Sequence, residues 1–188
     1  GAGLSSIALM LKDRGVEVSA VDREASPTLQ MLDDQGIPVK VGSWPEKVVE
    51  GTGLILSDAI RLDEPEVLKA DQLGCPIFRR SQALGWLLGD KKVIAVTGTH
   101  GKTTTSSMVA MGLREAGLDP TIIVGAKIPQ LGTSIVEGSG EWAVVEACEA
   151  YESYLDLDPY LVVLTNLEPD HLDYHETWEK LQDSVTRF

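Results

Sequence analysis

Hydrophobic and polar positions in the first half of the chain switch repeatedly between a helical period and short apolar runs. In residues 4–14 four apolar side chains share one helical stripe, and Gly15 ends the pattern, so a helix is predicted. Ser26 and Ser81 are the expected N-caps of two later helices. Strands are expected at 16–22, 38–42, 53–60 and 75–80, and further helices at 27–35, 64–74 and 81–88. Such alternation is typical of a parallel sheet covered by helices.

The second half of the chain repeats this alternation after a polar break. The sequence GDKK at 89–92 precedes a fresh apolar strand, so we expect one domain over 1–89 and another over 90–188. In the second domain we expect strands at 93–97, 121–125, 142–147 and 160–165, helices at 103–116 and 175–187, and an irregular glycine-rich segment before 142. The predicted fold class is α/β: a Rossmann-like parallel-sheet domain followed by the start of a P-loop-type α/β ATPase domain.

Charge and composition narrow the range of partners. The 188 residues carry 16 Lys and Arg against 29 Asp and Glu, a net charge of −13, which disfavours nucleic acids and anionic membranes as partners. Cys75 and Cys148 lack metal-type spacing, so we expect free thiols in a reducing, cytoplasmic compartment. No apolar run is long enough to predict a membrane span.

The most informative stretch is TGTHGKTT, which lies between a predicted buried strand and a predicted helix. In such a turn the backbone N–H groups and the helix N-terminus attract phosphate oxygens. Lys102 would supply a charge to the β- and γ-phosphates and Thr103 a hydroxyl to Mg²⁺, although Val96 replaces the first glycine of the usual pattern. His100 is expected either to pack within the loop or to contact the ligand. The residues predicted to bind ATP are Gly98, Thr99, His100, Gly101, Lys102, Thr103, Thr104 and Asn166.

The opening stretch GAGLSS is a second glycine-rich turn. With Asp22 nineteen residues after Gly3 it is similar to a dinucleotide-binding fingerprint, but Ser6 stands where the third glycine belongs. A contact with a diphosphate and a plain tight turn therefore both remain open. Because the chain starts inside this turn and without Met, we expect that a preceding strand, and further chain at the other end, are missing from the sequence.

A third group of polar residues follows two apolar runs, VVEACEAYESY and LVVLTNLEPDHLDYH. Parallel strands deliver such residues to one sheet edge, so we expect Thr103, Glu146 and His171 to converge there on Mg²⁺ and phosphates. For Glu149 and Glu152, a plain surface charge is as good an interpretation as a metal ligand. We expect His175 to cap or flank the last helix. Other polar residues after the second run are Asn166, Glu168, Asp170 and Asp173, and the two at 170 and 173 are also plausible helix N-caps.

The order TGTHGKTTT, EACEA and TNLEPDHLDYH resembles the Mur ligases of bacterial cell-wall synthesis, over essentially the whole chain. The resemblance implies an ATP-dependent ligase that joins L-alanine to the carboxylate of UDP-N-acetylmuramate through an acyl phosphate, with Mg²⁺ as cofactor. It also implies three domains, of which this chain would hold the first and part of the second. On that basis we expect the 188 residues alone to bind but not to catalyse.

The resemblance also implies roles for individual residues. The catalytic residues would be Lys102, Glu146 and His171, and the metal ligands Thr103, Glu146 and His171. The residues implied for the UDP sugar are Gly1, Ala2, Gly3, Ser5, Asp22, Ser57 and Arg79. Cys148 and Tyr151 depart from the family's acidic pattern, which favours Glu146 over Glu149 as a ligand.

Three alternatives compete with this interpretation. One is a Mur-type ligase that adds a whole tripeptide during wall recycling, for which the expected longer basic insertion is absent from the sequence. Another is an NAD-dependent oxidoreductase, which would use GAGLSS and Asp22 but leave the GKT loop unexplained. The third is a module that only binds a UDP sugar. The sequence leaves monomer and homodimer equally open.

Overall fold

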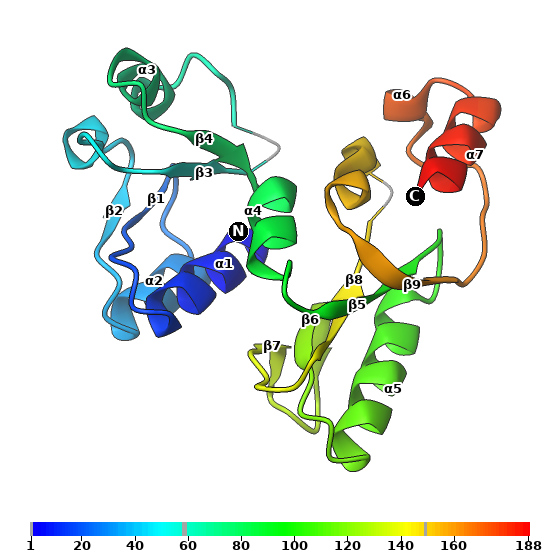
Figure 1. Ribbon diagram of the computed structural model, residues 1–188. Helices are drawn as coiled ribbons and strands as arrows, with labels where there is room; N and C mark the ends of the chain where they lie inside the picture. Colours follow the sequence, from blue (N-terminus) through cyan, green and yellow to red (C-terminus); the bar gives the residue numbers. More distant parts are fainter. Residues whose placement is uncertain (1, 58–59, 149) are drawn as a thin grey trace. The chain divides into compact units, whose positions relative to one another are not determined.

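The computed structural model describes residues 2–57, 60–148 and 150–188 (Figure 1). The chain forms two compact units, Gly1–Ala83 and Leu84–Phe188. The predicted α/β class is confirmed, because strands and helices alternate in both units and most strand pairs are parallel.

The first unit contains two separate two-stranded parallel sheets, β1–β2 and β3–β4. Each of these strands has three residues, which is shorter than the apolar run that predicted it. The elements are α1 (Ala2–Asp13), β1 (Ala20–Asp22), α2 (Pro27–Asp34), β2 (Val39–Val41), the 3₁₀ turn η1 (Pro45–Lys47), β3 (Leu54–Leu56), α3 (Pro65–Gln72), β4 (Ile77–Arg79) and α4 (Arg80–Leu87), which continues into the second unit.

Helix starts in this unit follow local chemistry. Ser26 caps α2 as predicted, since its hydroxyl accepts a hydrogen bond from the N–H of Leu29 at 3.1 Å. The prediction that Ser81 caps α4 is wrong: the helix begins one residue earlier and Ser81 is buried within it. Instead, the side-chain oxygen of Gln82 accepts from the N–H of Arg79 at 2.9 Å, so a reach-back from the first turn satisfies that amide.

The first unit has a small core on each sheet. Ala8, Leu32 and Ile37 are buried beside the first pair of strands, with partly buried side chains of α1 and α2 around them. Cys75 is buried in the second core with Val48 and Ala70. Burial of these side chains, rather than long strands, holds the helices in place.

The second unit is built on one five-stranded sheet in the order β7-β6-β8-β5-β9. All neighbouring pairs are parallel except β6–β7, and α5 packs along the sheet (Figure 1). The elements are β5 (Lys92–Thr97), α5 (Lys102–Glu115), β6 (Thr121–Ile128), β7 (Thr133–Val136), β8 (Trp142–Glu146), η2 (Ala150–Asp156), β9 (Pro159–Leu164), α6 (Leu172–His175) and α7 (Trp178–Arg187).

Two features of this unit differ from the sequence prediction. Part of the glycine-rich segment forms β7, an antiparallel edge strand held by pairing with β6. The predicted helix 175–187 begins later, at Trp178, and the short helix α6 precedes it with His175 as its buried last residue. Thr177 caps α7 by accepting from the N–H of Lys180 at 3.3 Å, so His175 flanks that helix and the prediction that it could be the cap is wrong.

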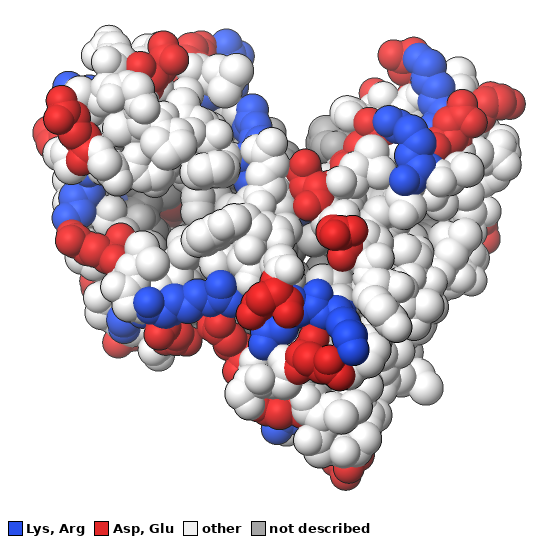
Figure 2. Space-filling view, in the orientation of Figure 1, with Lys and Arg blue, Asp and Glu red and all other residues white. Residues whose placement is uncertain are grey.

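The surface carries both signs of charge. On the face shown in Figure 2, lysine and arginine side chains lie among aspartates and glutamates. Of the helices in the described parts of the chain, none combines the length and the apolar character needed to cross a membrane.

Candidate functional site

The candidate site of the second unit lies where three parallel strands end together. Val96 of β5 is in register with Glu146 of β8, and Thr97 is in register with Leu164 of β9. The N–H of Thr165 donates to the carbonyl of Thr97 at 3.0 Å, which extends this pairing past β9. The segments that carry the predicted phosphate, metal and ATP residues therefore leave the sheet at one edge, as expected for parallel strands.

The loop at residues 98–101 connects β5 to α5 and uses glycine at both ends. Gly98 has φ +128° and Gly101, the residue before α5, has φ +80°. Both angles disfavour side chains, which explains the two glycines of the motif. The first amides of α5 have no carbonyl one turn earlier to bond to, so they remain suited to an anion.

Lys102 is the first residue of α5, and its side chain reaches back to this loop. Its ammonium donates to the carbonyl of Gly98 at 2.5 Å and to that of Thr99 at 3.3 Å. Thr103, the next residue of α5, is half-buried, while Thr104 is exposed. The lysine charge is therefore held over the loop that is predicted to receive the phosphates.

The segment after β9 binds the same loop from the other side. Asn166 uses both ends of its amide group on the backbone of His100, and Thr165 donates to the same residue's carbonyl at 2.6 Å. The imidazole Nε2 of His100 lies 3.9 Å from a carboxylate oxygen of Glu168. His100 is thus held through its backbone, while its imidazole is 69% exposed.

Glu146 ends β8 and is held by the neighbouring strand. Its Oε2 accepts from the N–H of Gly125 at 2.6 Å. A Cβ added at Gly125 would lie 2.6 Å from the other carboxylate oxygen, so this glycine leaves room for the acid. His171 precedes α6 with φ +51°, and its N–H donates to the Asp170 carboxylate at 2.8 Å.

Within residues 2–57, 60–148 and 150–188 there is no cluster of three or more His, Cys, Asp or Glu side chains that could hold a metal ion. Glu149 lies outside the described residues.

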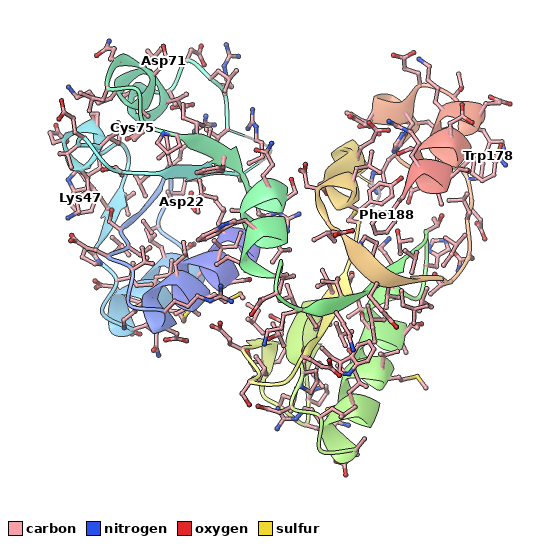
Figure 3. All side chains as sticks on the ribbon, viewed as in Figure 1. Asp22, Lys47, Asp71, Cys75, Trp178 and Phe188 are labelled. Carbon is pink, nitrogen blue, oxygen red and sulfur yellow. The ribbon has the colours of Figure 1, made fainter. Side chains whose placement is uncertain are left out.

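In the first unit three of the predicted sugar-binding residues, Asp22, Ser57 and Arg79, lie at strand ends. Asp22 ends β1, and its carbonyl accepts from the N–H of Gly42 at 2.8 Å (Figure 3). The guanidinium of Arg79 donates to the carbonyl of Ser57 at 3.1 Å, so the structure brings those two residues together. Ser5 is buried in α1.

Gly3, in the first turn of α1, lies against an arginine. A Cβ added there would be 2.8 Å from the Arg80 side chain. Gly1 and the side chain of Ala2 lie outside the part of the chain that the structure describes.

Sequence reasoning missed several residues beside these sites. Arg80 could have been found as the second member of the pair in CPIFRR, and Gly125 as a glycine inside a predicted strand, a sign of close approach. Thr165 carried no comparable signal, because its role depends on a loop 65 positions away.

A hollow of about 620 Å³ lies elsewhere in the second unit, beside α6 and α7. It is lined by Glu152, Tyr174, His175, Glu176, Lys180, Asp183, Thr186 and Arg187. Arg187 pairs with Glu152, and Lys180 pairs with Glu176 at 2.5 Å. None of the predicted site residues lines this hollow. The candidate site is therefore the loop at 98–101 together with the strand ends beside it.

Comparison with known proteins accounts for both halves of the chain. Residues 1–92 match the Mur ligase family catalytic domain, and residues 96–188 match the Mur ligase middle domain. The chain belongs to the Mur ligase family. Its phosphate loop lies in the part matched by the middle domain, and GAGLSS lies in the other part.

The alignments with named relatives cover the whole of this Mur ligase chain. A UDP-N-acetylmuramate–L-alanine ligase of Caldicellulosiruptor saccharolyticus is 43% identical over 189 aligned residues, and one of Carboxydothermus hydrogenoformans is 42% identical. The alignments cover 100% of this chain but only 42% and 41% of those two proteins. The chain thus spans about two fifths of the length of these relatives.

Solved structures agree with the fold. The UDP-N-acetylmuramate–alanine ligase of Thermotoga maritima has a TM-score of 0.89 and 28% identity, covering 100% of this chain and 44% of that one. The UDP-N-acetylmuramate:L-alanyl-γ-D-glutamyl-meso-diaminopimelate ligase of Neisseria meningitides has a TM-score of 0.87 and 28% identity, with 100% and 64% covered.

Proposed function

We propose that this chain belongs to an ATP-dependent ligase that joins L-alanine to the carboxylate of UDP-N-acetylmuramate during peptidoglycan precursor synthesis in the cytoplasm. The observation that carries the proposal is the 42–43% identity, over the whole chain, to relatives named for that activity. The geometry of the loop at 98–101, with Lys102 over it, supports a role in holding nucleotide phosphates.

The proposed reaction needs little covalent chemistry from the protein. The muramate carboxylate attacks the γ-phosphorus of ATP, ADP leaves, and an acyl phosphate forms. The amine of L-alanine then attacks the acyl carbon, inorganic phosphate leaves with the bonding electrons, and the proton lost from the nitrogen passes to the solvent. Such transfers depend on positioning and on neutralised charge. Lys102 and the first amides of α5 are the groups proposed to hold the phosphates.

The donor set fits Mg²⁺. This ion is usually bound by one or two carboxylates together with substrate phosphates, and the Glu146 carboxylate ends β8 in register with Val96, two residues before the phosphate loop. We assign the Thr103 hydroxyl, the Glu146 carboxylate and the His171 imidazole to it. When bound, Mg²⁺ would supply positive charge that stabilises the transferring phosphoryl group. Gly125 would keep the Glu146 carboxylate in place.

We assign the UDP sugar to the first unit. Gly3 and Ser5 lie on α1, whose N-terminus suits a diphosphate, and Asp22 ends β1. Ser57 and Arg79, which contact each other, are proposed to line the same site. Gly1 and Ala2 complete the proposed set.

Two alternatives are weaker. Addition of a tripeptide is favoured by the Neisseria meningitides structure at 28% identity, but the Thermotoga maritima alanine ligase is equally similar at 28%, and the named alanine ligases reach 42–43%. The NAD-dependent oxidoreductase hypothesis explains only the opening turn, whereas both halves of the chain belong to one ligase family.

Calorimetric titration of this chain with UDP-N-acetylmuramate, with ATP and Mg²⁺, and with NAD tests the proposal. We expect saturable binding of the first two and none of NAD. Lys102→Ala should weaken ATP binding at least tenfold, because the contact between the Lys102 ammonium and the ATP phosphates is lost. The affinity for the UDP sugar should stay unchanged. Unchanged ATP affinity in that variant, or binding of NAD alone, would overturn the proposal.

A further inference from the structure

The segment after β9 closes directly on the phosphate loop. Gly98 has no space for a side chain, because an added Cβ would lie 2.3 Å from the Thr165 hydroxyl and 2.6 Å from the carbonyl of Asn166. The N–H of Thr99 donates to that same carbonyl at 3.2 Å. Residues 66 or more positions apart are therefore packed backbone to backbone at this point.

The side chain of Asn166 completes this contact. Its Oδ1 accepts from the N–H of His100 at 2.9 Å, and its Nδ2 donates to the carbonyl of His100 at 3.1 Å. Both polar ends of one amide group thus bind both backbone groups of one loop residue. The amide of Asn offers a donor and an acceptor side by side, whereas the carboxylate of an aspartate of the same shape only accepts at neutral pH.

Two threonine hydroxyls strengthen the same junction. Thr165 donates to the carbonyl of His100 at 2.6 Å, and Thr99 accepts from the N–H of Glu168 at 2.9 Å. Because Lys102 donates to the carbonyls of Gly98 and Thr99, the conformation fixed by these bonds also determines where the lysine charge lies. The conformation of the loop therefore depends on residues 165, 166 and 168 as well as on its own two glycines.

We propose that Asn166 is a positioning residue that fixes the backbone of the phosphate loop, and thereby the position of Lys102, instead of contacting ATP itself. A loop that is already in its binding conformation loses less conformational entropy when it binds the phosphates. The inference rests on the proposed function for its link to ATP, but the effect on the loop itself can be measured without any nucleotide.

The test compares Asn166→Asp with Gln182→Glu, which makes the same change from amide to carboxylate on the exposed face of α7. Amide hydrogen exchange is measured by mass spectrometry over the peptide containing residues 98–101, without nucleotide. Asn166→Asp should exchange there at least tenfold faster than the wild type at pH 7.5, while Gln182→Glu should match the wild type.

The pH dependence of Asn166→Asp gives a readout that general destabilisation would not produce. At low pH a protonated aspartic acid regains one O–H donor beside an acceptor oxygen, as in the amide. The affinity of Asn166→Asp for ATP and Mg²⁺, relative to wild type at the same pH, should be lower by about tenfold or more at pH 7.5 and recover only as the pH approaches about 4, where an aspartic acid ordinarily becomes protonated.

Each result has a defined meaning. Equal exchange and equal ATP affinity in Asn166→Asp and wild type would overturn the positioning role. Failure of the wild type to bind ATP would overturn the proposed function, and the exchange data alone would then decide the inference. If Asn166→Asp does not fold, Thr165→Val, which loses one donor to His100, must accelerate exchange in the loop while Thr165→Ser must not.

Discussion

The backbone N–H of Gly125 in β6 donates to the carboxylate of Glu146 at the end of β8, with 2.6 Å between nitrogen and oxygen. We predict that Gly125→Ala weakens the binding of ATP with Mg²⁺ at least tenfold, because the new methyl group would occupy the position of that carboxylate. Stability should change by less than about 1 kcal/mol, since only the end of a flexible side chain has to move. Calorimetry and urea unfolding measure the two effects separately.

Gly112→Ala is the matched control for that variant. Gly112 is exposed in α5, and nothing lies within 4 Å of the position of a new Cβ. Alanine should therefore raise the free energy of unfolding by about 0.5–1 kcal/mol and leave ATP binding unchanged. Normal ATP affinity in Gly125→Ala would remove Glu146 from the proposed metal site.

A second prediction concerns the hydroxyl of Thr97, which is buried and has no hydrogen-bond partner in the described part of the chain. Thr97→Val keeps the shape of the side chain and removes the unsatisfied oxygen, so the free energy of unfolding should rise by about 1–2 kcal/mol. Urea unfolding followed by circular dichroism measures this gain.

Thr121 provides the contrast, because its equally buried hydroxyl bonds both the carbonyl and the N–H of Gly138, at 3.3 and 3.2 Å. Thr121→Val should lower the free energy of unfolding by about 1 kcal/mol or more. The same sign for both valine variants would contradict our interpretation of the Thr97 hydroxyl.

A third prediction tests a buried polar pair beside α7. The Tyr154 hydroxyl lies 2.7 Å from the Ser184 hydroxyl, and both side chains are almost inaccessible to water. Tyr154→Phe leaves the serine without this partner, so the free energy of unfolding should fall by about 1–2 kcal/mol. Tyr160→Phe, at a side chain that is 68% exposed, should change it by less than about 0.5 kcal/mol. Equal losses in thermal or urea unfolding would show that the buried pair contributes nothing specific.

The fourth prediction concerns acid. The N–H and the hydroxyl of Ser139 both donate to the carboxylate of Asp119, at 2.8 and 2.7 Å, and these bonds lower the pKa of Asp119 below its ordinary value of 3.8. A depressed folded-state pKa stabilises the fold above about pH 3.8, and this contribution disappears as the pH falls through the lower value.

Asp119→Asn does not titrate, so the stability difference between it and the wild type should shrink as the pH is lowered from 6 to 3. Urea midpoints across that range provide the measurement. Ser139→Ala keeps the backbone donor and loses the hydroxyl, and should give an intermediate pH dependence. A difference that is constant with pH would contradict the role of the carboxylate charge.

Much of the fold could be predicted from local pattern. The N-cap at Ser26, the helix after the GKT turn and the parallel β5, β8 and β9 all follow from periodicity and turn chemistry within a few residues. β7 could not be predicted in this way, because a short, partly buried segment becomes a strand only when β6 offers it a partner.

For the site, the sequence by itself indicated the candidate chemistry: one glycine-flanked phosphate loop, a lysine, a threonine and the polar residues after two strands. This was possible because a phosphate loop needs particular residue types at adjacent positions. The opening GAGLSS, predicted as a second glycine turn, is helical from Ala2 onwards. Tertiary structure alone decided that Asn166 binds the backbone of His100 and that Gly125 holds Glu146. Those contacts join residues 66 and 21 positions apart, and the register between strands, which no local pattern encodes, determines which residues meet.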